Sequence, residues 1–190
     1  MAITLDLKTL RLTQGGGVLT VRLNRPEVRN AMSLQMVGEL LQALEAAESD
    51  ASVRVVVLRG EGGHFCSGGD IGDMAQARMR MAAGEGDAMA DVNARFGRLC
   101  LAYSRSRLPI VTVVEGSVMG GGFGLACVSD VTLALANVAF RLPETSLGIV
   151  PAQIAPFLVE RIGYAEAKRL AVTGGKVDAQ EALTIRLVHE

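Results

Sequence analysis

Two glycine-rich stretches hold the residues of this sequence whose spacing could support chemistry. The first reads GEGGHFCSGGD over Gly60–Asp70, and the second contains the triple glycine Gly120–Gly122. Because glycine lacks a Cβ atom, the backbone N–H groups of such loops can approach a ligand closely. The apolar run Phe123–Val128 predicts a short helix after the second loop, and a helix N-terminus adds positive potential. The pattern indicates a site for an anion or an oxyanion, with tight packing of a strand on a helix as the alternative.

Two other chemistries of glycine loops are excluded by the neighbouring residues. A dinucleotide-binding fingerprint requires G-x-G-x-x-G, but the run that begins at Gly122 has Cys127 where the third glycine should stand. A phosphate-binding P-loop requires a lysine and a hydroxyl residue after its last glycine, but the Gly-Lys pair of this chain is followed by Val177.

Strands must deliver both loops to one place. Val53–Leu58 and Ile110–Val114 are short, β-branched apolar runs that predict buried strands, and a glycine-rich loop follows each of them. Val131–Ala136 predicts another strand after the short helix. Strands that alternate with helices indicate an α/β fold with a largely parallel sheet. Since ligands of such sheets bind beyond the carboxyl ends of the strands, we expect both loops to face one crevice.

The remaining segments predict elements that surround this centre. They are a hairpin of Leu10–Thr13 and Val18–Leu23, a helix capped by Ser33 that runs to Glu48, a helix over Ala88–Tyr103, helices over Ile154–Ile162 and Ala165–Thr173 separated by Gly163, and a last helix capped by Asp178. Ala139–Glu144 predicts a strand edge and a turn. Ile71–Gly86 has weaker periodicity, so it is either a mobile lid or a frayed helix.

Composition limits the class of protein. The chain has 190 residues, 49% of them hydrophobic, which predicts a single domain over residues 1–190. A formal net charge of -1 gives no general reason to bind nucleic acid or an acidic membrane surface. The N-terminal residues lack a secretory pattern, which predicts a cytoplasmic protein. Three cysteines without C-x-x-C spacing predict reduced thiols and no metal site, and His64 is expected to be a loop histidine.

Four segments form a set of motifs in order along the chain: LNRPEVRNAMS from Leu23, HFCSGGDI from His64, VEGSVMGGGFGLA from Val114 and FRLPETSLGIVP from Phe140. Together they resemble the enoyl-CoA hydratase/isomerase family, whose fold is the crotonase (ClpP/crotonase-like) fold. The resemblance implies a spiral of β-β-α units that forms a homotrimer or a dimer of trimers. It implies an acyl-CoA substrate and no separate cofactor, because CoA is part of the substrate. Family members continue beyond the position of Glu190, so the C-terminal helical part is expected to be truncated here.

The resemblance also assigns roles to residues. Two backbone N–H groups, those of Ser67 and Gly121, are expected to stabilise a thioester enolate. Glu144 is the expected catalytic carboxylate, with a stabilising place at a helix start as the alternative. Hydratases of the family commonly have a second glutamate where this chain has Gly124, and this glycine predicts space for a branched or carboxylated acyl chain. The residues expected to contact the substrate are Ser67, Gly68, Gly69, Asp70, Gly121 and Gly124.

Other side chains have weaker assignments. Arg25 and Arg29 lie in the turn that the resemblance places beside CoA and are candidates for phosphate contacts. The side chain of Asp70 is expected to cap a helix. Cys66 shows no activating partner, so a structural role is expected. Three methionines either line an acyl pocket or belong to ordinary packing: Met74, Met79 and Met81.

The predicted activity is hydration of the 2,3-double bond of an acyl-CoA. The run GGGFGLACVSD from Gly120, followed by LPETSLGIVPAQIAPF from Leu142, is similar to bacterial hydratases of 3-methylglutaconyl-CoA and isohexenylglutaconyl-CoA. A branched glutaconyl thioester is therefore the expected substrate. A single carboxylate at Glu144 equally suits an enoyl-CoA isomerase. A third possibility is an acyl-CoA-binding or assembly protein without turnover, because Gly124 replaces a glutamate.

Overall fold

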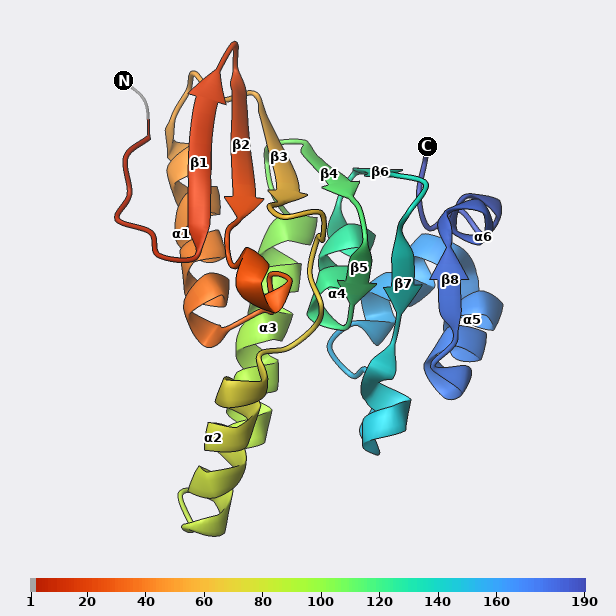
Figure 1. Ribbon diagram of the computed structural model, residues 1–190. Helices are drawn as coiled ribbons and strands as arrows, with labels where there is room; N and C mark the ends of the chain where they lie inside the picture. Colours follow the sequence, from red (N-terminus) through yellow and green to blue (C-terminus); the bar gives the residue numbers. More distant parts are fainter. Residues whose placement is uncertain (1–2) are drawn as a thin grey trace.

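A five-stranded sheet forms one half of the molecule in the computed structural model, which describes residues 3–190 (Figure 1). The hairpin of β1 (Leu10–Gly15) and β2 (Val18–Leu23) is antiparallel, with Leu10 opposite Leu23. The strands that follow are all parallel and run in the order β2, β3 (Val55–Gly60), β4 (Ile110–Val114) and β6 (Val131–Ala134). The predicted α/β fold with a largely parallel sheet is therefore confirmed.

A second, three-stranded sheet lies beside the first. Its strands are β5 (Ser117–Met119), β7 (Ala139–Arg141) and β8 (Lys176–Asp178), in the order β5-β7-β8. The sequence did not predict β5 or β8, because three residues are too few to show an alternating pattern. β5 matters most for the site, since it leads directly into the triple glycine.

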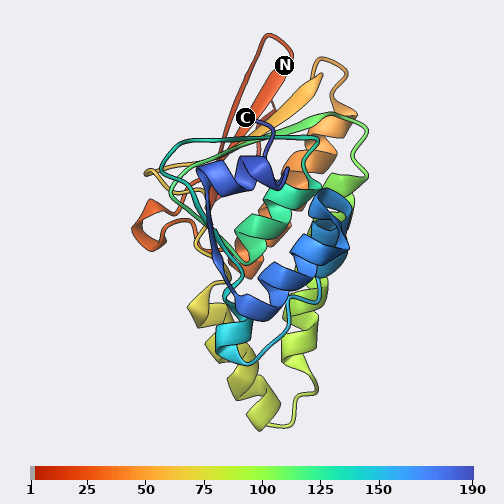
Figure 2. The ribbon, with the colours of Figure 1, turned by 90° about the vertical axis from the view of Figure 1, so that its right-hand side faces the viewer.

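The helices lie along one side of the strands (Figures 1 and 2). They are α1 (Leu34–Ser49), α2 (Ile71–Ala82), α3 (Ala88–Ser104), α4 (Gly121–Val128), α5 (Ala155–Thr173) and α6 (Ala179–Thr184), with short 3-10 helices η1 (Pro26–Val28) and η2 (Pro143–Leu147). α3 packs against α1, α2 and α4, and α4 packs against α5. Of the helices within residues 3–190, none has the length and apolar character needed to cross a bilayer.

Several local predictions are confirmed. Ser33 caps α1 through its hydroxyl, which accepts a hydrogen bond from the N–H of Met36 at 3.1 Å, and Asp178 caps α6. Gly163 interrupts α5 with non-helical angles of φ 78° and ψ 163°. Residues 71–82 form the helix α2, which projects with the first half of α3 away from both sheets (Figure 1). The helical alternative for this segment is thus the observed one.

The buried core reaches up to the second glycine loop. All residues of α4 from Gly122 to Val128 are buried. The rings of Phe123 and Phe140 meet at 5.3 Å between centroids, so α4 is packed against the second sheet. Burial of this helix on every side fixes the position of its N-terminus, and with it the position of Gly121.

Candidate functional site

The first glycine loop is held in place by one buried amide. Asn30, which adopts a left-handed conformation with φ 56°, is fully buried. Its Nδ2 donates to the carbonyl oxygens of Glu61 and His64 at 2.9 and 2.7 Å, while its Oδ1 accepts from the N–H of Arg25 at 2.8 Å. Two isolated parallel β-bridges also hold the loop, one between Met32 and Gly69 and one between Cys66 and Val118 of β5. Sequence reasoning missed Asn30, although it lies within the segment LNRPEVRNAMS.

Ser67 was predicted to supply the first oxyanion donor, and this prediction is wrong. The backbone N–H of Ser67 donates to the carbonyl oxygen of Arg29 at 3.0 Å, and its hydroxyl donates to that of Val28 at 3.0 Å. Ser67 is not among the residues that line the cavity described below. Its N–H group is therefore already satisfied on the other side of the loop.

Gly69, rather than Ser67, supplies the N–H group of the first loop that faces the cavity. The carbonyl oxygen of Gly68 accepts from the N–H of Met32 at 2.8 Å, and the N–H of Asp70 donates to the carbonyl oxygen of Met32 at 3.0 Å. Because neighbouring backbone groups of an extended chain point to opposite sides, the N–H of Gly69 points away from Met32. Gly69 lines the cavity, and within residues 3–190 its N–H has no acceptor.

The second loop brings Gly121 to the same place. Gly120 has φ 47° and ψ -114°, a conformation that favours glycine. A Cβ atom on Gly120 would lie 3.2 Å from Glu144 Oε1 and 3.5 Å from the Cα of Gly68, so the two loops and Glu144 are neighbours. Gly121 is the first residue of α4, and its N–H has no acceptor in the described part of the chain. The predicted donor Gly121 is thus available.

Glu144 faces the two loops with an unsatisfied carboxyl oxygen. It is the second residue of η2, which begins at Pro143. Its Oε2 is buried and has no hydrogen-bond partner among residues 3–190. Burial raises the pKa of Glu144 above its ordinary value, and only its own backbone N–H opposes this shift. A carboxyl group in this state is poised to exchange a proton with a ligand.

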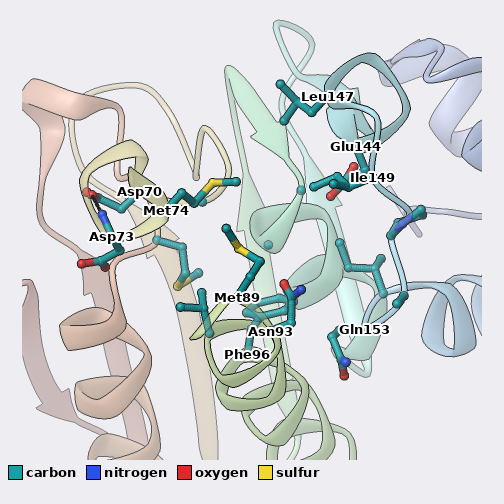
Figure 3. A pocket seen from close by; sticks show the side chains of 18 of the residues that line it. Asp70, Asp73, Met74, Met89, Asn93, Phe96, Glu144, Leu147, Ile149 and Gln153 are labelled. Atoms are coloured by element: carbon teal, nitrogen blue, oxygen red, sulfur yellow. Dashed lines mark hydrogen bonds between the residues drawn. The ribbon is translucent and has the colours of Figure 1, made fainter. Parts of the chain in front are cut away.

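One cavity of about 150 Å³ joins these groups (Figure 3). Its walls come from α1, α2, α3, both glycine loops and the segment from η2 to α5 and are mostly apolar; they include Met32, Val37, Met74, Met89, Val92, Phe96, Leu147, Ile149, Val150 and Ile154. Met74 lines the cavity, which agrees with the acyl-pocket alternative for this residue. Met79 and Met81, which are 65% and 43% exposed, do not line it, so the acyl-pocket alternative is wrong for these two residues.

Gly124 was predicted to open space for the acyl chain, and the structure contradicts this. Gly124 is buried and does not line the cavity. A Cβ atom there would lie 3.0 Å from Cζ of Phe96 and 3.3 Å from Cγ1 of Ile154. The space beside Gly124 is therefore filled by the ring of Phe96, which itself forms part of the cavity wall. The sequence held no signal for this contact, because Phe96 reads simply as an apolar residue of a helix.

Asp70 acts as a cap, as predicted. Its Oδ1 accepts from the N–H groups of Gly72 and Asp73 at 2.9 and 3.1 Å, and its Oδ2 pairs with Arg25 at 2.8 Å. Burial raises the pKa of Asp70, but the hydrogen bond from Arg25 and the cap outweigh it and leave the pKa below its ordinary value. The Asp70 carboxylate is thus engaged within the protein by the cap and by Arg25.

The two arginines proposed for CoA differ in availability. Arg25 donates from one nitrogen to Asp70 and to the carbonyl oxygen of Ala31 at 2.7 Å, so it ties the turn to the first loop. The prediction of Arg25 as a phosphate contact is not supported by this geometry. Arg29 is exposed, and its guanidinium makes no hydrogen bond within residues 3–190.

His64 and Cys66 have structural roles. Nδ1 of His64 accepts a hydrogen bond from the N–H of Ser117 at 3.0 Å, which joins the first loop to β5. Cys66 is fully buried, and burial raises the pKa of its thiol to about 11, which opposes a nucleophilic role. Over residues 3–190, no group of three His, Cys, Asp or Glu side chains is arranged to hold a metal ion.

The geometry defines a class of chemistry. Two N–H groups from separate loops and one carboxyl group with a raised pKa surround a largely apolar cavity. Such donors stabilise negative charge that develops on a carbonyl oxygen, while the carboxyl group can move a proton on a neighbouring carbon.

Comparison with known proteins identifies the family to which the chain belongs. The sequence profile described as enoyl-CoA hydratase/isomerase matches residues 13–190, so the chain belongs to the enoyl-CoA hydratase/isomerase family. The solved structure of Pseudomonas aeruginosa AtuE is 55% identical in sequence and has a TM-score of 0.91. The match covers 96% of this chain and 69% of AtuE. This likeness confirms the crotonase fold.

Two curated relatives carry different activities in their names. Probable 3-hydroxyisobutyryl-CoA hydrolase 3 of Arabidopsis thaliana is 34% identical over 174 residues, which cover 90% of this chain and 44% of that protein. The 2,3-dehydroadipyl-CoA hydratase of Escherichia coli K12 is 33% identical over 174 residues, which cover 91% of this chain and 65% of that protein. The chain thus spans less than half of the first relative and about two thirds of the second.

Proposed function

We propose that this protein hydrates the 2,3-double bond of an acyl-CoA thioester. The observation that carries the proposal is the buried, unpartnered Oε2 of Glu144, which lies at the same cavity as the free N–H groups of Gly69 and Gly121. The family to which the chain belongs includes hydratases and isomerases, which supports the reaction class.

In the proposed reaction the thioester carbonyl accepts hydrogen bonds from Gly69 and Gly121. Ionised Glu144 orients a water molecule and removes its proton while the water oxygen bonds to C3. The electron pair of the double bond moves through C2 onto the thioester oxygen, where both N–H groups stabilise the enolate. Glu144 then returns the proton to C2, so that one water is added and the carboxylate is regenerated. CoA takes part only as the carrier of the acyl group.

For the acyl group we propose a branched glutaconyl chain, such as 3-methylglutaconyl or isohexenylglutaconyl. The name of the Escherichia coli relative, 2,3-dehydroadipyl-CoA hydratase, supports an acyl chain that carries a second carboxylate. The mostly apolar wall supports a hydrocarbon branch, because methionine and aliphatic side chains adapt to such shapes. Roles in leucine or terpene catabolism and a cytoplasmic location stay predictions.

The test is an assay of hydration with 3-methylglutaconyl-CoA, isohexenylglutaconyl-CoA and crotonyl-CoA. We expect turnover of a branched substrate and a loss of at least about 100-fold in Glu144→Gln, since a positioned acid-base contributes about 10²–10⁴-fold. Glu45→Gln is the matched control, because Glu45 is an exposed residue of α1. Equal activity of Glu144→Gln and the control would refute the assigned role.

An isomerase is the second candidate. Among residues 3–190, the cavity wall has one carboxyl group that no other residue engages, that of Glu144. A single base of this kind can carry a proton between two carbons of the acyl chain. Reactions in H₂¹⁸O separate the two: hydration places ¹⁸O in the product, whereas double-bond migration places none. Binding of thioesters with no turnover in either assay would instead favour a non-catalytic acyl-CoA-binding protein.

We also propose that the protein assembles as a homotrimer or a dimer of trimers. Apolar side chains on α5 support an interface there: Tyr164 is 68% exposed and Val172 is 65% exposed. Sedimentation equilibrium tests the assembly, and a monomer at micromolar concentration would contradict it.

A further inference from the structure

The side chain of Asn30 lies outside the cavity, and both ends of its amide bind the backbone. Asn30 is fully buried and is not among the residues that line the cavity. Its Oδ1 accepts from the N–H of Arg25, and its Nδ2 donates one hydrogen bond each to the carbonyl oxygens of Glu61 and His64. Asparagine is the shortest side chain that offers an acceptor and two donors at once. One amide therefore ties the turn after β2 to two points of the first glycine loop.

The two carbonyl oxygens that Asn30 binds belong to a tightly folded part of this loop. A Cβ atom on Gly60 would overlap the carbonyl oxygen of His64, so the chain folds back on itself between these two residues. Gly62 has a left-handed φ of 75°, and a Cβ atom there would lie 2.6 Å from Cβ of Pro26. The loop thus packs against the turn without side chains of its own, and the Asn30 amide supplies the hydrogen bonds that join the two.

The backbone of Asn30 makes the turn that leads to Met32. Arg29 and Asn30 have consecutive left-handed φ values of 51° and 56°, a conformation in which asparagine is several-fold enriched. After this turn, Met32 bonds through both its N–H and its carbonyl oxygen to the residues on either side of Gly69. The side chain of Asn30 therefore holds the start of the loop, while its backbone places the bridge partner of Gly69.

The N–H groups of Gly69 and Gly121 can act together only if both point at the same ligand atom. The position of Gly121 does not depend on Asn30, because α4 is buried on every side after its first residue. The geometry of the pair therefore depends on how firmly the first loop is held. A displacement of about 1 Å in such a site can lower a rate by about 10²-fold.

We infer that Asn30 is a positioning residue, whose amide sets the place of the Gly69 N–H relative to that of Gly121 and thereby the stabilisation of the enolate. The inference rests on the proposed function, because it requires the thioester oxygen to lie between these two N–H groups. Asn30 touches no substrate, so its effect on the reaction passes through the backbone of the loop.

Two substitutions separate the amide from the rest of Asn30. Asn30→Asp keeps the size of the side chain and the acceptor for Arg25, but an ionised carboxylate cannot donate to the two loop carbonyls. Asn30→Gly keeps the left-handed backbone and removes the amide. Asn30→Asp carries the test if Asn30→Gly does not fold. Tyr103→Phe is the matched control, because the buried hydroxyl of Tyr103 donates to the carbonyl oxygen of Leu40 at 3.0 Å and joins α3 to α1 without touching either loop.

The test measures the hydrogen bonds on the thioester oxygen directly. Butyryl-CoA is saturated and cannot be hydrated, so infrared difference spectra with a ¹³C-labelled thioester carbonyl record the bound group without turnover. Hydrogen bonds weaken the C=O bond, so the stretching frequency should be lower in the wild-type complex than in free butyryl-CoA. Since one of two donors is displaced, this shift should be roughly halved in Asn30→Asp and Asn30→Gly. Tyr103→Phe should retain the wild-type shift.

Turnover of crotonyl-CoA gives a second readout. Both Asn30 variants should lose at least about tenfold in kcat, with KM changed by less than about threefold, because the full charge on the thioester oxygen develops only as water adds. If Asn30 served stability alone, its variants would lower the unfolding free energy, as Tyr103→Phe does, and would leave kcat and the carbonyl frequency at their wild-type values.

The outcomes separate this inference from the proposed reaction. A wild-type carbonyl shift that persists in the folded Asn30 variants would overturn the inference and leave the proposed reaction standing. A shift that is reduced in these variants, in a protein that hydrates no thioester, would support the inference and overturn the proposed reaction. A bound carbonyl without any shift in the wild type would overturn both, since the thioester oxygen would then not lie at Gly69 and Gly121.

Discussion

The contact between Gly124 and Phe96 can be tested by adding one methyl group. In Gly124→Ala the new Cβ would lie 3.0 and 3.2 Å from Cζ and Cε1 of Phe96 and 3.3 Å from Cγ1 of Ile154. Carbon atoms in good contact are about 3.5–4.0 Å apart, so the ring must move by about half an ångström. Overpacking of this kind costs about 1–3 kcal/mol, while replacing a helical glycine by alanine returns about 0.5–1 kcal/mol. We expect a net loss of about 0.5–2 kcal/mol in unfolding free energy.

Urea unfolding of a double-mutant cycle measures this contact. In a Phe96→Leu background the smaller side chain can yield, so Gly124→Ala should become neutral or stabilising, with a coupling energy of about 1–2 kcal/mol. Gly38→Ala in α1 is the control, because a Cβ atom there meets no atom within 4 Å. That variant should gain about 0.5–1 kcal/mol.

The same gain for Gly124→Ala with and without Phe96 would refute the reasoning. A functional readout accompanies the stability measurement: because the displaced ring belongs to the cavity wall, Gly124→Ala should reduce turnover of a branched substrate more than that of crotonyl-CoA. Equal losses for both substrates would show that the ring does not move into the acyl space.

Further predictions concern three titratable groups. The raised pKa of Glu144 means that its ionised form destabilises the folded protein, so Glu144→Gln should raise the unfolding free energy at pH 7. This gain should vanish as the pH falls below 4.5, the ordinary pKa of a glutamate, because the carboxyl group is then protonated in both the folded and the unfolded state. For wild-type activity, the base form should be lost around a pKa above 4.5; a midpoint at or below this value would contradict the assigned burial. Asp70 has a lowered pKa, so Asp70→Asn should reduce stability at pH 7, with the difference shrinking as the pH falls below 3.8. Urea unfolding at several pH values checks both variants, and a pH-independent difference would argue against either shift. The thiol of Cys66, buried with a pKa of about 11, should resist iodoacetamide at pH 8 until the protein unfolds; rapid alkylation of the native state would contradict its burial.

The elements with long patterns were predictable from the sequence. The apolar stripe of α1 and its Ser33 cap, the hairpin, and the break at Gly163 each leave a local signature, and each is present in the structure. β5 and β8 were missed because their residues are ordered by pairing with β7 and not by their own pattern.

The site was predictable to the level of loops but not of individual atoms. Gly121 and Glu144 lie where the motifs indicated, whereas Ser67 was the wrong donor of its loop. Which N–H group faces the cavity is decided by the bridge between Gly69 and Met32, a contact that no local spacing encodes. For the same reason, the filling of the space beside Gly124 by Phe96 could not be predicted, since α3 and α4 meet only in the folded chain.

The bridge between Met32 and the first glycine loop has a consequence for how the protein matures. The groups that face the cavity come from distant parts of the chain, represented by Met32, Gly69, Gly121 and Glu144. Contacts of such large sequence separation form late, because the intervening loops must first be closed. A chain that has formed only its N-terminal hairpin and α1 therefore lacks the cavity to which we assign thioester binding. We expect the proposed acyl-CoA binding to return during refolding only when all four of these segments have docked.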